Sequence, residues 1–358
     1  MKSAPAFLLA IGLAVAASPA PSADRIVVVA GGGTDTNSTA PLRALDARLN
    51  GPFGVDFDSE GNLYLVEMPA NRVRKLDPGG NLSVIAGTGE KGGRNGPALS
   101  AQFNGLHSLA VFSDQIFVAD TWNNQVRVVF LANGTVKPGI GTGEKGFSGD
   151  GHDARAAKFG GIYCVSVGGD QQFYLADLDN LRIRALDPKT GRVRTVAGNG
   201  TKGVPTDGAQ AVDAPLLDPR AVIADALGRV YILERGGNAL RMVDTNGAIR
   251  TIAGTGAKGF SGDGGSARDA TMNGPKHLCF DLDGSVLIAD TENHAVRRYT
   301  PRDGKINRVA GTGKRGSRGA GASPLECELN QPHGVTLRRD GTIYICDSSN
   351  NRVLRIEK

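Results

Sequence analysis

Short runs of alternating apolar and polar residues follow one another along most of this 358-residue chain, with turn sequences between them. In the first clear unit, residues 54–58 alternate, and three further apolar-rich runs follow at residues 62–66, 72–76 and 82–86. Alternation with a period of two, bounded by Gly, Pro, Asn and Asp, is typical of antiparallel strands joined by tight turns. Each unit therefore predicts a four-stranded antiparallel meander.

The same four-run unit recurs at a nearly constant interval. An acidic residue ends the second run of each copy, and successive acids are 53 to 57 residues apart: Glu67, Asp120, Asp177, Glu234, Asp290 and Asp347. A steady period of this length indicates a repeat architecture. One meander cannot bury both of its faces, whereas six of them packed around an axis can. The sequence predicts an all-β fold, a six-bladed β-propeller with four-stranded blades.

The order of the runs is offset between the two ends of the chain. Residues 25–33 supply the end of a unit that has no beginning, while the last unit stops at Lys358 after its third run. We therefore expect the N-terminal strand, residues 25–30, to complete the last blade and close the ring. The domain assignment is a signal peptide at residues 1–23 and a single propeller at residues 24–358.

The first residues have the pattern of an export signal. Lys2 is followed by an apolar stretch at residues 6–17 and by small residues at 18–23, as in cleaved secretory signals. We expect an exported protein, periplasmic or extracellular; an uncleaved anchor is the alternative. The rest of the chain has no run of 18 apolar residues, which predicts no membrane span in the mature chain.

Three strings carry a resemblance to a known family. Residues 61–67, 115–127 and 342–353 resemble NHL repeats, and Gly-Phe-Ser-Gly-Asp-Gly at 146–151 and 259–264 resembles the NHL subtype of teneurin-like and exported bacterial proteins. The resemblance implies the propeller fold over residues 25–357. It leaves the function open, because NHL propellers include binding modules, sensor domains, RNA binders and a few lyases.

One column of the repeat differs from blade to blade, at the start of the innermost strand beside the central channel. We predict a binding site there, formed by Phe53, His107, Tyr163, Arg220, Lys276 and His333. Residues with a structural role recur in every copy of a repeat, whereas residues with a functional role differ from copy to copy. The alternative is that this column only lines a solvated channel mouth and binds nothing. The cationic members favour an anionic or carboxylate-bearing ligand.

We favour a non-enzymatic, monomeric binding module without a cofactor, whose ligand is a protein, a peptide or a glycan. The 41 basic and 36 acidic residues are mixed along the chain, so no basic patch indicates a nucleic-acid partner. The alternative is a metal-dependent lyase or hydrolase resembling peptidylglycine alpha-amidating lyase. Pro332-His333 and Leu106-His107 resemble the placement of histidines in that enzyme, so His107 and His333 are the candidate metal ligands.

A third protein ligand, which catalytic zinc sites usually have, is missing from that set. Arg220 and Lys276 occupy two of the other blades, where their charges would repel a dication. His277 is one residue out of phase and is expected to point into its blade.

The remaining polar columns have structural interpretations. In five units an Arg follows the acid by seven residues, which suggests ion pairs across blades, and the recurring loop residues Asn71, Asn124, Asn238 and Asn351 are expected in turns. Asp150, Asp207 and Asp263 provide one carboxylate per loop, too few for calcium, so they are interpreted as helix caps, with Asp153 an alternative cap for a helix near residues 152–159. Asp56 and Asp58 are interpreted as hairpin residues on the opposite rim.

The four cysteines have no metal-binding spacing. Three of them lie in predicted strands and are expected to be buried thiols, namely Cys164, Cys279 and Cys346. A Cys327–Cys346 disulfide is the alternative in an oxidising compartment.

Overall fold

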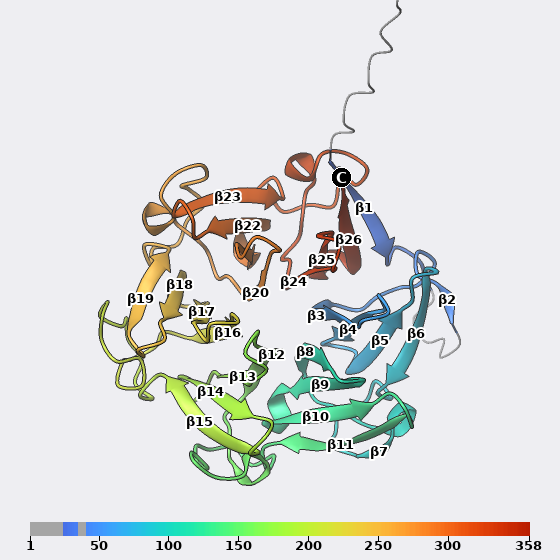
Figure 1. The fold of residues 1–358 in the computed structure, drawn as a ribbon. Coiled ribbons are helices and arrows are strands. Elements are labelled where there is room, and N and C mark those ends of the chain that lie inside the picture. Colours follow the sequence, from blue (N-terminus) through green and yellow to red (C-terminus); the bar gives the residue numbers. More distant parts are fainter. Residues whose placement is uncertain (1–23, 35–40) are drawn as a thin grey trace, which may run out of the picture.

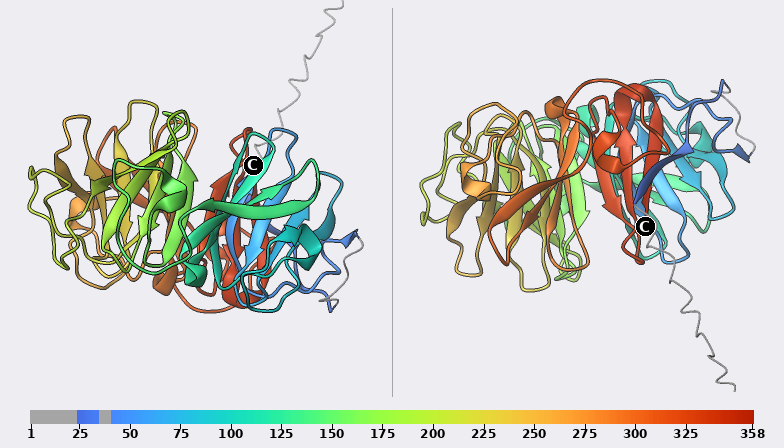
Figure 2. Two further views of the ribbon diagram at one scale, coloured as in Figure 1. Left: turned by 90° about the horizontal axis from the view of Figure 1, so that it is seen from below. Right: turned by 90° about the horizontal axis from the view of Figure 1, so that it is seen from above.

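The computed structural model describes residues 24–34 and 41–358, and the predicted signal segment at 1–23 lies outside them. Six antiparallel sheets surround a central axis (Figure 1), each with its first strand innermost. This arrangement confirms the predicted six-bladed propeller. Side views show the sheets standing side by side in a single ring (Figure 2).

The strands of blades 1 to 3 are, from the axis outward, β3 (Pro52–Phe57), β4 (Leu63–Glu67), β5 (Arg72–Leu76) and β6 (Asn81–Ala86); β8 (Leu106–Phe112), β9 (Gln115–Asp120), β10 (Gln125–Phe130) and β11 (Thr135–Ile140); β12 (Ile162–Val167), β13 (Phe173–Asp177), β14 (Arg182–Asp187) and β15 (Arg192–Ala197). Those of blades 4 to 6 are β16 (Pro219–Ala224), β17 (Val230–Glu234), β18 (Ala239–Val243) and β19 (Ile249–Ala253); β20 (His277–Phe280), β21 (Val286–Asp290), β22 (Ala295–Thr300) and β23 (Lys305–Ala310); β24 (Gly334–Leu337), β25 (Ile343–Asp347), β26 (Arg352–Glu357) and β1 (Arg25–Ala30).

The N-terminal strand closes the ring, as predicted. β1 is the outermost strand of blade 6 and pairs antiparallel with β26, with Ile26 opposite Ile356 and Val28 opposite Leu354. The exposed ion pair between Arg25 and Glu357, at 3.0 Å, lies at the end of this ladder. The two ends of the described chain are therefore held side by side by one sheet.

Loops and short strands cover the outer edges of the blades. β2 (Leu42–Arg43) pairs with β6, and β7 (Gly96–Pro97) pairs with β11. Bridges from the preceding loop reach the outer strands of blades 3, 4 and 5: Asp150 to Val193, Gln210 to Ala248 and Ser266 to Lys305. Covered edges expose few free backbone groups for pairing with another chain.

Short 3-10 turns take the place of the expected inter-blade helix. These inter-blade turns are η1 (Ala98–Ser100), η3 (Ala154–Ala156), η4 (Ala267–Asp269) and η6 (Pro324–Glu326). Others lie between the second and third strands of a blade: η2 (Thr121–Asn123), η5 (Thr291–Asn293) and η7 (Ser348–Asn350). Asp153 caps η3 by accepting a hydrogen bond from the Arg155 N–H at 2.9 Å.

The capping interpretation is wrong for the other three loop acids. Asp150 pairs with Arg184 at 2.7 Å, Asp207 with Arg268 at 2.7 Å, and Asp263 with Arg297 at 2.9 Å. The loops fold back over the blades and bring these acids within reach of arginines, so they serve as ion-pair partners.

The core lies between neighbouring blades and holds three of the four cysteines. All four are free thiols, and Cys327 and Cys346 belong to two different hydrophobic clusters, so the alternative disulfide is absent. Cys164 and Cys346 are buried as expected, but Cys279 is only half-buried. Its side chain lies in the wall of the central channel.

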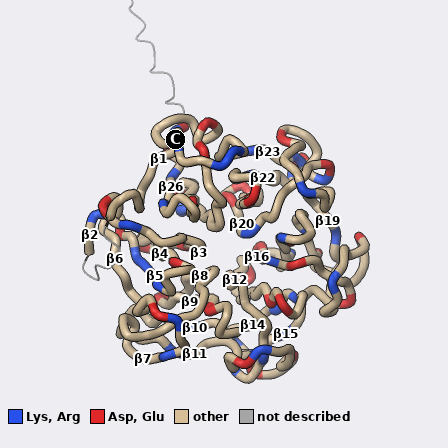
Figure 3. Tube along the Cα trace, turned by 180° about the vertical axis from the view of Figure 1, so that it is seen from behind, with Lys and Arg blue, Asp and Glu red and all other residues tan. Residues whose placement is uncertain are grey.

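Charged residues of both signs are interspersed around all six blades (Figure 3). In the part of the chain that the structure describes, no helix has the length and hydropathy needed to cross a membrane.

Candidate functional site

Buried ion pairs fix the upper rim of the propeller, the rim on which the inter-blade loops lie. Each acid pairs with an Arg on the third strand of its own blade, which corrects the expectation of pairing across blades. The pairs are Glu67–Arg74, Asp120–Arg127, Asp177–Arg184, Glu234–Arg241, Asp290–Arg297 and Asp347–Arg352, at 2.6 to 3.6 Å. In blade 6 Arg352, five residues after the acid, replaces the Arg expected at seven.

The same acids position the predicted site. Each carboxylate accepts a hydrogen bond, at 2.7 to 2.9 Å, from the backbone N–H three residues before the variable residue of its blade. The donors are Asn50, Asn104, Gly160, Leu217, Asn273 and Asn330. The recurring acids therefore fix the backbone that leads to the six variable residues of the predicted site.

A second set of contacts clamps each blade to the next. The loop residues Asn71, Asn124, Asn238 and Asn351 have φ between 45° and 53°, as expected for turn positions. Their Oδ1 atoms also accept N–H groups from the next blade, at 2.7 to 3.1 Å, from Gly105, Gly161, Gly274 and Gly51. His294 does the same through Nδ1, with the Gln331 N–H at 3.1 Å.

The joint between blades 3 and 4 lacks this clamp. Leu181 occupies the loop position at φ 50° and has no polar side-chain atom to accept from Asp218. Arg220 spans the joint instead, since its Nη1 donates to the Tyr163 carbonyl at 3.2 Å. Arg220, a cation of the predicted site, thus lies at the joint where the repeat lacks the asparagine or histidine clamp.

Backbone bulges present the variable residues to the channel. In blades 1 to 4 the pairing of the first two strands shifts register at this position, so that Phe53, His107, Tyr163 and Arg220 lie opposite no partner. A β-bulge re-aims a side chain and is frequent beside functional sites. Lys276 and His333 occupy the residue just before β20 and β24.

The structure brings all six predicted residues together in one ring, which we call the upper ring. His107, Phe53 and His333 lie in contact, with ring centroids 5.5 and 3.9 Å apart. Tyr163 packs on His107 at 4.5 Å, and the Arg220 guanidinium lies 4.5 Å from the Tyr163 ring. Lys276 Nζ is 3.3 Å from His333 Nε2. Phe53, His107 and Arg220 are at most 8% exposed, so their side chains close this mouth of the channel.

Arg220 carries a buried positive charge with no acidic partner among the described residues. Its side chain is 5% exposed, and its Nε makes no hydrogen bond there either. Burial, followed by the charge of Arg235, lowers its pKa to about 10, so it remains protonated at neutral pH. Such a charge is costly to bury unless something compensates it.

Two further cations nearby are compensated. Arg235 pairs with Asp218, and Lys276 pairs with Glu292 at 2.7 Å. Burial lowers the pKa of Lys276, although the Glu292 carboxylate opposes the shift. The cluster therefore holds one positive charge in excess, that of Arg220.

The two histidines of the upper ring are uncharged. Their Nδ1 atoms lie 2.9 Å from the Gly105 carbonyl and 2.8 Å from the Gln331 carbonyl, so Nδ1 carries the proton in both. Burial lowers the pKa of His107 and His333 well below the usual value, and the charges of Arg220 and Lys276 lower both further. They can each provide an acceptor at Nε2.

The arrangement does not fit the metal alternative. Phe53 contacts both imidazoles and lies between them, and His333 Nε2 already faces Lys276 Nζ. No cluster of three or more His, Cys, Asp or Glu suitable for a metal ion occurs in the described residues. His277 does not supply a third ligand at the ring, and the expectation that it points into its blade is wrong, since it lines the channel below the ring.

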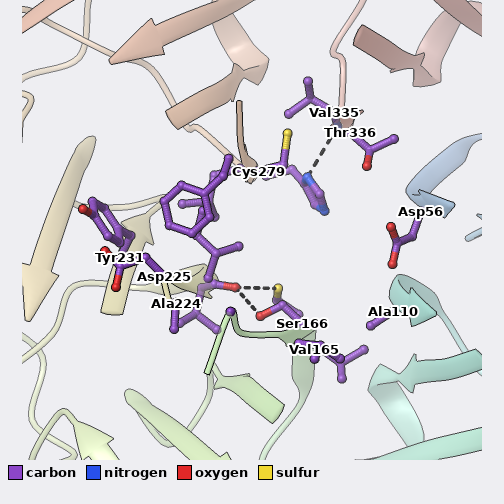
Figure 4. Close-up of a pocket in the computed structure, with 18 of the residues that line it drawn as sticks. Asp56, Ala110, Val165, Ser166, Ala224, Asp225, Tyr231, Cys279, Val335 and Thr336 are labelled. Carbon is purple, nitrogen blue, oxygen red and sulfur yellow. Dashed lines mark hydrogen bonds between the residues drawn. The ribbon is translucent and has the colours of Figure 1, made fainter. Parts of the chain in front are cut away.

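Below the upper ring the channel widens into a cavity of about 460 Å³ (Figure 4). Its wall includes Asp56, which corrects the interpretation of that residue as part of a hairpin turn: it lies within β3. The column to which Asp56 belongs also diverges, and its other members are Ala110, Ser166, Ile223, Cys279 and Thr336. That divergence is the sequence signal that could have revealed the cavity.

Comparison with known proteins agrees with this geometry. Residues 329–356 match the family model of the NHL repeat. The chain is an NHL-repeat β-propeller. It is 25% identical to Protein SUPPRESSOR OF QUENCHING 1, chloroplastic, of Arabidopsis thaliana and 25% identical to human Teneurin-1, each over 74% of this chain. The matched region covers only 26% of the length of the Arabidopsis protein and 8% of the length of Teneurin-1.

Solved structures show the same fold at lower identity. An auxiliary nutrient binding protein from Bacteroides ovatus aligns with a TM-score of 0.68 and 16% identity, over 94% of the NHL chain and 76% of its own. A streptogramin B lyase aligns with a TM-score of 0.55 and 14% identity, over 95% and 99%. The propeller fold is therefore shared by proteins whose names describe different functions.

Proposed function

We propose that this protein is a non-enzymatic binding module that recognises a carboxylate-bearing ligand at the upper ring. The observation that carries the proposal is Arg220, a buried guanidinium without an acidic partner in the described residues. A carboxylate can accept two parallel hydrogen bonds from such a group. Because the excess charge of the cluster is a single one, a monoanionic group matches it.

The surroundings of Arg220 supply the rest of a recognition surface. Tyr163 is half-buried, and Trp122 is 45% exposed with its ring centroid 5.8 Å from that of His107. Exposed aromatic faces next to a cation suit peptides and glycans, two of the three ligand classes considered from the sequence. The fold alone does not distinguish a binding protein from an enzyme, since its structural neighbours include a nutrient binding protein and a lyase.

Trp122 provides a direct test, because it is the only tryptophan in the chain. We would titrate the protein with matched pairs of small probes, N-acetyl dipeptides against their C-terminal amides and glucuronate against glucose, and follow tryptophan fluorescence. We expect the carboxylates of at least one pair to bind and their neutral counterparts to bind at least tenfold more weakly. Loss of one charge-assisted hydrogen bond, about 1.5–3 kcal/mol, corresponds to such a factor.

Variants locate the effect. Changing Arg220 and Lys276 together to Ala should abolish the fluorescence response and the capture of partners from envelope extract. The matched control changes two exposed residues of blade 5, Arg302 in the turn between β22 and β23 and Lys305 at the start of β23. It should leave the fluorescence response and the capture unchanged. Unaltered binding by the Arg220→Ala/Lys276→Ala variant would refute recognition at the upper ring.

The metal-dependent lyase or hydrolase remains as a second candidate only through the pair His107 and His333. Elemental analysis of the purified protein separates the candidates, because that activity would need a stoichiometric metal ion.

We also propose that the protein acts outside the cytoplasm, as a monomer. The proposed location rests on the sequence pattern of residues 2–23, and N-terminal sequencing of the mature protein checks it.

A further inference from the structure

The channel cavity below the upper ring is a separate compartment. All six first strands contribute to its wall, which reaches Gly169, Asp225 and Gly284 at the lower rim, where the hairpin turns between the first two strands lie. None of the upper-ring residues belongs to that wall. The cavity is therefore closed above and accessible from the lower rim, and its volume is in the range of small-molecule sites.

Most wall residues have apolar side chains, and of the charged residues Asp56, Asp225 and Arg229 only Asp56 has no ion-pair partner among the described residues. The partly exposed apolar residues of this wall are Phe57, Val111, Val167, Ile223 and Phe280. Figure 4 shows the Asp56 carboxyl group facing the cavity from the side opposite Ala224 and Tyr231. No other first strand places an acid at the position of Asp56.

Asp56 is held in place by the backbone and by no cation. Its Oδ1 accepts from the Phe57 N–H and its Oδ2 from the Val111 N–H, both at 2.8 Å. It forms no ion pair with any residue that the structure describes, whereas the nearby Asp225 pairs with Arg229 at 2.6 Å. Each Asp56 oxygen keeps a lone pair for a donor in the cavity.

The neighbouring groups leave the carboxylate without compensation. Burial raises the pKa of Asp56 to about 6, so it is ionised at neutral pH. The His277 imidazole is uncharged there, because burial and the Arg220 charge lower its pKa to about 4. Asp281, the other acid near the half-buried Cys279, already pairs with Arg298. A cation in the cavity would offset the cost of this isolated, half-buried carboxylate.

The chemistry of the wall points to an organic cation. Calcium requires six to eight oxygen ligands with several carboxylates. The wall contains His277, Cys164 and Cys279, but in the described residues they do not come together with Asp56 in a cluster that could hold a transition metal. One unpaired carboxylate, the Thr336 hydroxyl and the apolar side chains nearby suit an ammonium group carried on an apolar body.

We propose that the lower channel cavity is a second binding site, which takes a small organic monoammonium ligand with its nitrogen at Asp56 and its apolar part against the partly exposed apolar side chains of the wall, such as Ile223 and Phe280. The ligand enters from the lower rim, because the upper ring closes the other mouth and carries positive charge. This site is independent of carboxylate recognition at the upper ring.

The test uses hexylammonium and phenethylammonium, with hexanol and hexanoate as uncharged and anionic counterparts, titrated calorimetrically into the whole protein. We expect the ammonium compounds to bind at least tenfold more tightly than hexanol and hexanoate not to bind, as one charge-assisted contact would give. Equal binding of hexanol and hexylammonium would overturn the proposal, and this result needs no variant.

Asp56→Asn keeps the size of the side chain and should weaken ammonium binding tenfold or more. Asp213→Asn, at an exposed position outside the channel, is the matched control and should bind as the unchanged protein does. Undiminished binding by Asp56→Asn would overturn the proposal.

Trp122 fluorescence separates the two sites, since this residue lies beside the upper ring. Ammonium binding should leave the fluorescence unchanged and should survive in the Arg220→Ala/Lys276→Ala variant. A fluorescence response to the ammonium probes would place them at the upper ring and overturn the assignment to the lower cavity.

Discussion

Five of the six joints between blades are built alike, and the sixth, between blades 3 and 4, is not. At the regular joints an Asn or His side chain accepts an N–H group of the next blade, as Asn124 does from Gly161 and Asn351 from Gly51. At the irregular joint Leu181 offers no such acceptor, and the buried cation Arg220 spans the gap. The clamp is kept at the joint that leads to Lys276, which is paired with Glu292, and is missing only where the unpaired Arg220 spans two blades. The comparison therefore links the loss of the clamp to an unpaired buried charge and not to charge beside the channel in general.

The largest effect is expected when the strand that closes the ring, β1, is removed. Deleting residues 25–33 takes β1 from blade 6 and exposes β26 along its length. We expect the ring to open and the midpoint of thermal unfolding to fall sharply, since a whole strand ladder and its buried side chains are lost. Circular dichroism measures the midpoint.

A synthetic peptide of residues 25–33 serves as the control for that deletion. Added in excess, it should restore part of the lost stability by mass action. An unchanged midpoint in the deleted protein would contradict closure by β1.

Exchanging the two kinds of joint gives the next largest effect. Asn124→Leu copies the irregular joint, leaves the buried Gly161 N–H without its acceptor and places Leu in the left-handed region. We expect a loss of about 2 kcal/mol or more in the free energy of unfolding. Leu181→Asn, the reverse change, should gain roughly 1 kcal/mol, because Asn tolerates positive φ better than Leu.

Chemical denaturation measures both changes, and Asn246→Leu, at an exposed turn position, is the control, expected to stay within about 0.5 kcal/mol. If Asn124→Leu proved as neutral as that control, the clamp would not distinguish the joints.

The fold was accessible from the sequence because the physics of one blade is repeated six times. The acids, the loop asparagines and the Gly-rich ends recur since each satisfies the same backbone groups in each copy, as Asp120 does for Asn104. The short N-terminal strand followed from the offset of the runs.

The site was accessible only in part. The column containing Arg220 stood out because it varies, and its members do meet at the channel. Whether they close or open the channel depends on packing between blades, such as Phe53 on His333, which residue spacing does not encode. The same holds for Asp56, since its position looked like a turn and its lack of a cation is a property of three-dimensional neighbours.

The smallest expected effect bears most directly on the irregular joint. Arg220→Met removes an uncompensated buried charge and keeps most of the aliphatic side chain, so the ligand-free protein should become more stable, by on the order of 1 kcal/mol. The same variant should lose carboxylate binding, as expected when a site is kept at the expense of stability. Thermal unfolding measures the gain, and Arg302→Met on the surface controls for loss of charge alone.

A drop in stability would mean that the Arg220 bond to the Tyr163 carbonyl and its contact with the Tyr163 ring replace the missing asparagine clamp. The irregular joint would then be a structural variant of the others, and the argument for a ligand at Arg220 would lose its main support.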